Sequence, residues 1–114
     1  SLDELRPFIR AVVERLDMLD DLSRAAMASP GASEVRHATF PTRYQRVRRL
    51  ADSIEPEPRK ADRDRITRLL VVLTASSSLR MWRDHLELSV DEVADDVDWI
   101  VRAAVAAANG RKER

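Results

Sequence analysis

Apolar and polar residues alternate along much of the chain with the three- and four-residue spacing of an amphipathic α-helix. The first segment is the clearest example, because one face of it carries a row of apolar side chains: Leu5, Phe8, Ile9, Val12, Val13, Leu16 and Leu19. Ser1 and Glu4 have the spacing of a capping box, whereas Pro7 favours a helix that begins at that proline. A short second helix is predicted over residues 21–28 and ends before Pro30.

The third segment predicts a helix that starts near Ser33 and is interrupted at Pro41. Proline lacks the N–H group that a helix interior needs and biases the preceding residue away from helical geometry. We therefore expect a kinked or restarted helix from about Thr42 to Ile54. The two prolines in Glu55–Pro58 predict a stiff linker after it.

A long helix is predicted from about Arg59 to Leu86. Residues 66–75 are almost wholly apolar, which is typical of a helix that is buried on all sides. A β-strand is the competing interpretation of this run, but the chain offers no second strand for it to pair with. The three hydroxyl side chains of Ser76–Ser78 are the predicted weak point, because they can bond back to helix carbonyls and bend the helix.

The last helix has the best-marked start, since Ser89 and Glu92 have the spacing of a capping box. Asn109 and Gly110 predict its end. Two apolar rows run along this helix, which leaves two interpretations: it lies in the middle of the monomer's core, or one row packs against a second copy of the chain. We favour the homodimer, with a predicted interface made of Val97, Ile100, Val101, Ala104, Val105 and Ala108.

Composition supports an all-α fold of about five to six helices, formed as one domain over residues 1–114. Cysteine is absent, which excludes disulfides and thiolate chemistry. No apolar run approaches the ~20 residues needed to span a membrane, and the charged amino end does not resemble a signal peptide. These features predict a cytoplasmic protein with no membrane partner.

Candidate chemistry is sparse. A basic run over residues 36–49 could bind nucleic acid, but a solvated helix face with salt bridges explains it better. His37 and His85 lie far apart in sequence, and neither has a second ligand at metal-binding spacing on its own helix face. We therefore predict no enzyme activity, no metal and no cofactor.

The segment over residues 60–108 resembles the last two helices of tetracycline-repressor (TetR) family regulators. The resemblance is carried by a small-residue stretch, a Leu-Arg/Trp-Arg-Asp run, a Leu-Ser turn, an acidic helix start and a tryptophan near the helix middle: Ser76–Ser78, Leu79–Asp84, Leu88–Ser89, Asp91–Glu92 and Trp99. Residues 1–54 match only in helix order and length.

The resemblance implies a dimer in which the last two helices of each copy form a four-helix bundle. It also implies an apolar effector pocket enclosed by the preceding helices. Nothing in the chain corresponds to the family's amino-terminal helix-turn-helix, so the chain is expected to be the regulatory domain alone. DNA would then be bound only through a domain not present here. The alternative is a stand-alone helical dimer that acts as a protein-interaction module without a small ligand.

Apolar faces of three predicted helices could converge on such a pocket, although an ordinary packed core explains the same pattern. The resemblance favours the pocket, with six candidate ligand-binding residues: Phe8, Val12, Phe40, Tyr44, Leu70 and Thr74. The expected effector is small and largely apolar. Tyr44 and Thr74 offer hydroxyls to orient it, and Arg36 and Arg43 favour an anionic end such as a carboxylate.

Overall fold

A computed structural model describes residues 2–18 and 31–112, with the side chains of residues 16, 32–37 and 111–112 left out. Five α-helices and no strand occur in these residues, so the predicted all-α class is confirmed. The α-helices are α1 (Leu5–Met18), α3 (Ala32–Asp52), α4 (Lys60–Leu73), α5 (Ser76–Arg80) and α6 (Val90–Lys112). A 3-10 turn, η1 (Leu2–Glu4), precedes α1, and a π-helical turn, η2 (Met81–His85), follows α5. The short helix predicted over residues 21–28 lies outside the described residues.

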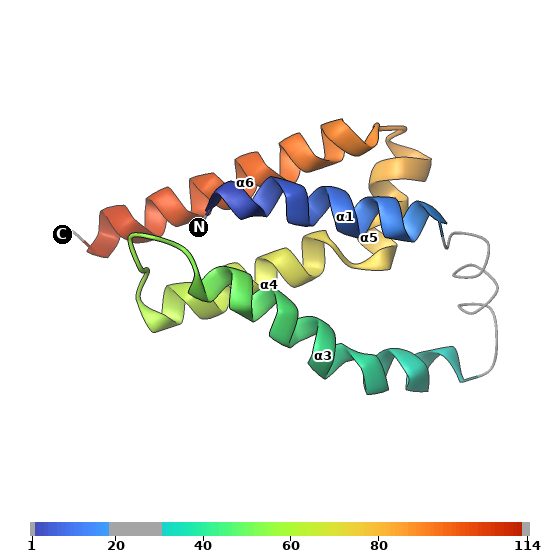
Figure 1. The fold of residues 1–114 in the computed structure, drawn as a ribbon, viewed down its shortest axis with the longest axis horizontal. Coiled ribbons are helices and arrows are strands. Elements are labelled where there is room, and N and C mark those ends of the chain that lie inside the picture. Colours follow the sequence, from blue (N-terminus) through green and yellow to red (C-terminus); the bar gives the residue numbers. More distant parts are fainter. Residues whose placement is uncertain (1, 19–30, 113–114) are drawn as a thin grey trace.

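The helices form two antiparallel pairs (Figure 1). One pair is α1 with α6, and the other is α3 with α4. The pairs are joined mainly by contacts between α4 and α6. Because α1 packs on α6 and α3 packs on α4, α1 and α3 are not themselves closely packed.

The core lies where α1, α4 and α6 meet. Apolar side chains at helical spacing on α1 and α6 supply most of it: Leu5, Ile9, Val13, Val93, Ala94, Val97, Val101 and Val105. The carboxyl-terminal part of α3 and the middle of α4 add Val47, Ala51, Ile66, Leu70 and Val71. Burial of these faces is the main stabilising contribution to the fold, because short helices are only marginally stable in water on their own.

Of the two predicted alternatives at Pro41, the restarted helix is wrong, because α3 is one continuous helix with this proline inside it. Pro41 is exposed on the helix surface. There, water can satisfy the carbonyl that the proline leaves without a donor. Figure 1 shows α3 changing direction between its teal and green parts, so the proline bends the helix without ending it.

The predicted single helix from Arg59 to Leu86 is also wrong, because it is broken at Thr74–Ala75. Ala75 has extended backbone geometry, with φ −63° and ψ 149°. Nor is α4 buried on all sides, since Val72 is 62% exposed while Leu70 is 1% exposed.

The last four carbonyls of α4 all accept hydrogen bonds from side chains, in addition to the backbone bonds that Leu70 O and Val72 O accept. The Thr74 hydroxyl donates to Leu70 O at 2.6 Å, and Arg43 Nη2 donates to Val71 O at 2.6 Å. Ser78 Oγ donates to Val72 O at 2.5 Å, and Trp82 Nε1 donates to Leu73 O at 3.3 Å. A helix can end in a protein interior when its last carbonyls find such partners, which is why the break is tolerated here.

The predicted start of α6 is confirmed. Ser89 N donates to Glu92 Oε1 at 3.0 Å, and Glu92 N donates to Ser89 Oγ at 3.1 Å, which are the two reciprocal bonds of a capping box. The predicted stop at Asn109 and Gly110 is wrong, because α6 continues to Lys112. A Cβ atom at Gly110 would meet nothing within 4 Å, so no close packing requires a glycine there.

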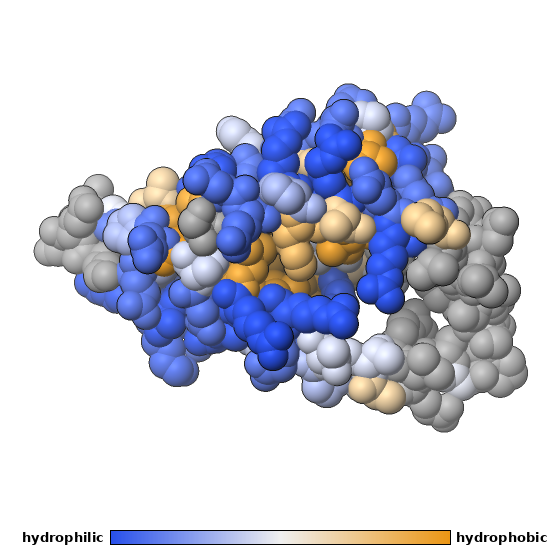
Figure 2. Space-filling model, in the orientation of Figure 1, coloured by the Kyte–Doolittle hydropathy of each residue, from blue (hydrophilic) through white to orange (hydrophobic). Residues whose placement is uncertain are grey.

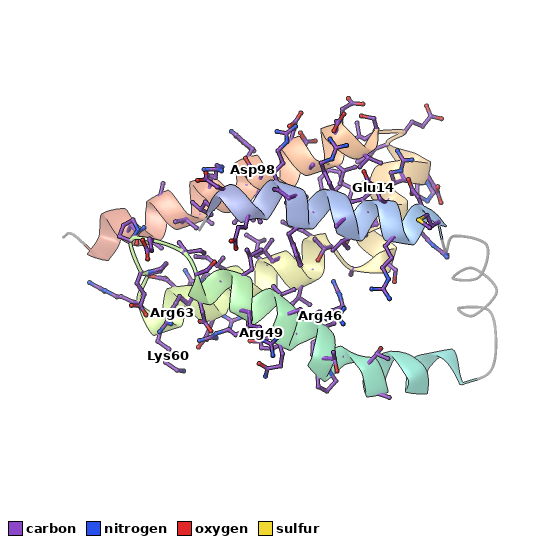
Figure 3. The ribbon with its side chains drawn as sticks, viewed as in Figure 1. Glu14, Arg46, Arg49, Lys60, Arg63 and Asp98 are labelled. Atoms are coloured by element: carbon purple, nitrogen blue, oxygen red, sulfur yellow. The ribbon has the colours of Figure 1, made fainter. Side chains whose placement is uncertain are left out.

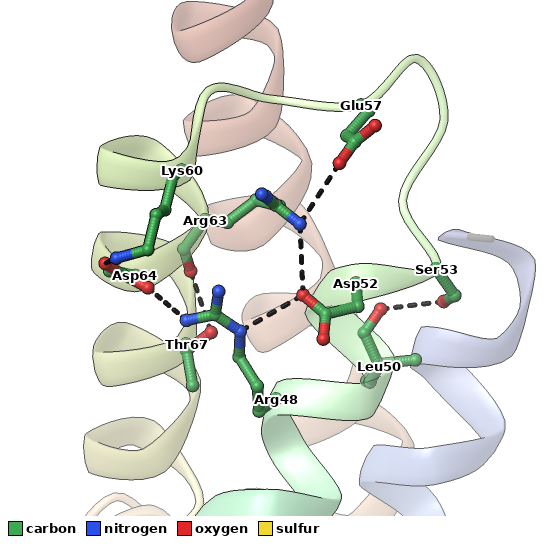
Figure 4. Close-up of polar contacts among 9 residues, drawn as sticks. All are labelled: Arg48, Leu50, Asp52, Ser53, Glu57, Lys60, Arg63, Asp64 and Thr67. Carbon is green, nitrogen blue, oxygen red and sulfur yellow. Dashed lines mark hydrogen bonds and ion pairs between the residues drawn. The ribbon is translucent and has the colours of Figure 1, made fainter.

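Ion pairs connect α3 with α4 beside the linker that joins the two helices (Figure 4). Arg48 pairs with Asp64 across the two helices, and its Nε atom also lies 3.1 Å from Asp52 Oδ1. Arg63 Nη1 lies 3.3 Å from the same Asp52 oxygen and 3.1 Å from Glu57 Oε1 in the linker. Part of the predicted basic run is therefore a salt-bridged helix face.

Candidate functional site

A cleft of about 460 Å³ lies between α1, α3 and the junction of α4 with α5. It exists because α1 and α3 each pack on a different partner helix and leave a space between them. Figure 2 shows apolar side chains beside this hollow and strongly hydrophilic ones along its edge. The volume falls within the range of about 300–1,000 Å³ that is usual for small-molecule sites.

The cleft is lined by residues from three separate segments. Phe8, Val12 and Arg15 come from α1, at a spacing that places them on one helix face. The α3 helix contributes five residues, which are Thr39, Phe40, Arg43, Arg46 and Val47. The helix break contributes the last four, which are Thr74, Ala75, Ser76 and Ser77.

Four of the six residues predicted from sequence line this cleft: Phe8, Val12, Phe40 and Thr74. The other two are close by but not in the lining. Leu70 is only 1% exposed and belongs to the core. Tyr44 is half-buried against the core, with its ring centroid 6.0 Å from that of Phe40.

The Thr74 hydroxyl is already engaged on both sides. It donates to Leu70 O and accepts a hydrogen bond of 3.1 Å from Arg43 Nη2. Its predicted role in orienting a ligand is therefore not supported by this geometry. The polar group that this part of the cleft presents is the Arg43 guanidinium itself.

Arg43 is the most distinctive polar residue of the cleft. Its side chain is half-buried, and burial lowers the pKa of its guanidinium below the ordinary value, because desolvation disfavours the charged form. Both of its bonds go to neutral acceptors, the Val71 carbonyl and the Thr74 hydroxyl. Within the described part of the chain, no carboxylate pairs with it.

Two further arginines, Arg15 and Arg46, stand at the exposed edge of the cleft. Arg46 extends from α3 toward the space that faces α1 (Figure 3). Sequence analysis missed both residues, although spacing could have found them: Arg15 follows Val12 by three positions, and Arg46 follows Arg43 by three. The described lining thus carries three cations and no carboxylate.

The predicted dimer residues on α6 divide into two groups. Val97, Val101, Val105 and Ala108 are buried inside the single chain. Ile100 and Ala104 are half-buried. The outer face of α6 carries a different apolar row, made of Trp99, which is 73% exposed, with the exposed residues Ala103, Ala106 and Ala107.

A second hollow, of about 610 Å³, lies where the end of α1 meets α5, η2 and the start of α6. Its lining is polar and contains both acidic and basic side chains. Arg83 already pairs with Asp17 at 2.7 Å and donates to Leu88 O at 2.7 Å. Because the four acids of its lining outnumber the two arginines, this hollow does not favour an anionic ligand.

In the residues that the structure describes, no helix combines the length and apolar character that a membrane span requires. The same residues contain no group of three or more histidine, aspartate or glutamate side chains placed to hold a metal ion. Comparisons with protein-family models, curated proteins and solved structures give no match for the chain. The cleft and the exposed face of α6 are therefore the observations on which a functional proposal has to rest.

Proposed function

We propose that the chain is a ligand-binding regulatory domain, in which a small and largely apolar effector binds in the cleft between α1, α3 and the α4–α5 junction. The observation that carries the proposal is the convergence of Phe8, Val12 and Phe40 from two helices that do not pack together. Large apolar side chains around a hollow of this size are typical of small-molecule sites. Phe40 is 46% exposed, and a bound ligand would cover it.

The resemblance to TetR family regulators extends this proposal from binding to signalling. In that interpretation the effector changes the position of α3 relative to α1, and the change reaches a DNA-binding domain that lies outside this chain. The α4–α5 break suits such a role, because Arg43 connects α3 to the end of α4 there. An effector can shift the two arrangements only by binding one of them more tightly than the other.

Thermal unfolding in the presence of a panel of apolar metabolites tests the proposal. A ligand present at 100 times its dissociation constant adds about 2.7 kcal/mol of stability. For a domain of this size we expect the unfolding midpoint to rise by several degrees.

A cleft-filling variant identifies the site of binding. Ala75 is half-buried in the cleft lining, so Ala75→Phe should fill the hollow and abolish the thermal shift. Ala61 is exposed on α4 outside the lining, and Ala61→Phe should leave the shift intact. A panel in which no compound stabilises the protein, or equal shifts for both variants, would contradict a ligand site in this cleft.

A second candidate function, a helical module that binds another protein chain, is favoured by the exposed apolar row on α6. Among the large apolar side chains that the structure describes, Trp99 is second in exposed fraction only to Met18. This surface fits a second copy of the chain, because its small alanines permit close helix approach. Dimer formation without any ligand-induced thermal shift would favour this second function.

A further inference from the structure

We infer that the ligand of the cleft is an amphipathic monocarboxylate, whose acid group binds Arg43 and whose apolar body lies against Phe8, Val12 and Phe40. This inference rests on the ligand-binding function proposed above and specifies the chemical class of the ligand.

Charge in the cleft supports an anion. Elsewhere in the described chain, many arginines are paired with carboxylates of the protein: Arg6 with Asp95, Arg10 with Asp91, Arg48 with Asp64, Arg63 with Asp52, Arg83 with Asp17 and Arg102 with Asp98. Within the same described residues, none of the three cleft arginines, Arg15, Arg43 and Arg46, has such a partner. Positive charges gathered in a cleft raise the local concentration of an anionic ligand.

Hydrogen-bonding capacity singles out Arg43 among the three. A guanidinium has five N–H donors, and the two bonds of Arg43 both use its Nη2 atom. The donors on Nε and Nη1 therefore remain for a ligand, as far as the described residues show. Arg43 is also half-buried, whereas Arg15 and Arg46 are exposed, and a hydrogen bond to an anion is stronger where water is partly excluded.

The apolar part of the cleft determines the other end of the ligand. Phe8 and Val12 lie on α1 opposite Phe40 of α3, and Val47 is buried at the base. Hydroxyls of Ser76 and Ser77 lie at the helix break rather than among these apolar side chains. A ligand with one charged end and an uncharged hydrocarbon body matches this separation of polar from apolar side chains in the cleft.

Matched pairs of ligands test the charge directly. Octanoate and octanamide have the same length, as do 4-phenylbutyrate and 4-phenylbutanamide, but only the acids are ionised at neutral pH. Titration calorimetry on the full chain should show that an acid binds at least tenfold more tightly than its amide. The preference should fall as salt is added, because the exposed arginines are screened.

Variants of Arg43 test whether this residue causes the preference for the acid over the amide. Arg43→Gln should bring the acid and the amide to equal affinity, while retained binding of the amide shows that the cleft is intact. Arg43→Lys keeps the charge and should keep part of the preference. Arg49 is exposed three positions beyond Arg46 on α3 and outside the cleft lining, so Arg49→Gln should leave the preference unchanged (Figure 3).

The outcomes separate this inference from the function on which it rests. If the amides bind as tightly as the acids, or if Arg43→Gln keeps the full preference, the carboxylate assignment is wrong but the cleft remains a ligand site. If neither acids, amides nor the apolar panel bind, both proposals fail. Should Arg43→Gln not fold, the comparison of acid with amide on the unaltered protein still decides the class of ligand.

Discussion

Arg48 on α3 and Asp64 on α4 form an ion pair that joins the two helices beside their connecting linker (Figure 4). The hydrogen bond from Arg48 is the largest influence on Asp64 and lowers the pKa of that carboxyl, and the Lys60 ammonium adds to the effect. The same hydrogen bond raises the pKa of Arg48. Folding therefore favours the ionised carboxylate of Asp64.

This pair predicts a loss of stability in acid. Because the pKa of Asp64 is lower in the folded chain than its ordinary value of about 3.9, the pair stabilises the fold above that value. The contribution is lost as the pH falls through the folded-state pKa. Asp64→Asn should thus lower the free energy of unfolding at pH 7, and its difference from the unaltered chain should shrink toward pH 3. Urea unfolding at several pH values measures this, with the exposed Asp96→Asn as control.

Substitutions at two residues of α4 are expected to change the free energy of unfolding by very different amounts. Leu70 is 1% exposed and Val72 is 62% exposed, although both belong to the apolar run. Leu70→Ala should lower the free energy of unfolding by about 2–5 kcal/mol, because it leaves a cavity in the core. Val72→Ala should change it by less than about 0.5 kcal/mol. Similar losses in the two variants, measured by urea unfolding, would mean that both faces of α4 are buried.

The capping box of α6 is expected to be a local source of stability. Ser89→Ala removes the acceptor for Glu92 N and should cost about 1 kcal/mol of unfolding free energy. Ser77 is exposed in the cleft and has no hydrogen bond to another described side chain, so Ser77→Ala should have little effect in the same urea titration. An equal loss in both would show that the helix start does not depend on the Ser89 hydroxyl.

Whether a structural feature could be predicted from the sequence depends on how far apart in the chain the residues that produce it lie. The start of α6 was predictable, because Ser89 and Glu92 lie three positions apart and bond to each other. The break at Thr74–Ala75 was not, because two of the last α4 carbonyls are bound by distant side chains: Val71 O by Arg43, 28 residues away in sequence, and Leu73 O by Trp82. Periodicity placed Phe8 and Phe40 on apolar helix faces, but only the divergence of α1 from α3 leaves a cleft between them.

The same reasoning applies to α6. Its sequence shows that the helix carries more apolar residues than one face can hold, but it does not show which row packs inside the chain. Val97 and Val101 pack within the chain, which removes them from any interface that leaves this fold intact. The row left outside begins at Trp99 and continues along Ala103 and Ala107. The homodimer prediction therefore moves from the inner row of α6 to the outer one.

The dimer is expected at micromolar concentration, with a mass by light scattering of about twice the 13.0 kDa of the chain. Ala103→Arg places a long charged side chain in the middle of the outer row and should give a monomer, since burying an unpaired charge is costly. Ala61→Arg makes the same change at an exposed site on α4 and should leave the mass unchanged. Both sites are exposed, so neither change should disturb the core, and circular dichroism should show the same helix content. A monomeric unaltered chain, or a dimer that survives Ala103→Arg, would exclude this face of α6 as the interface.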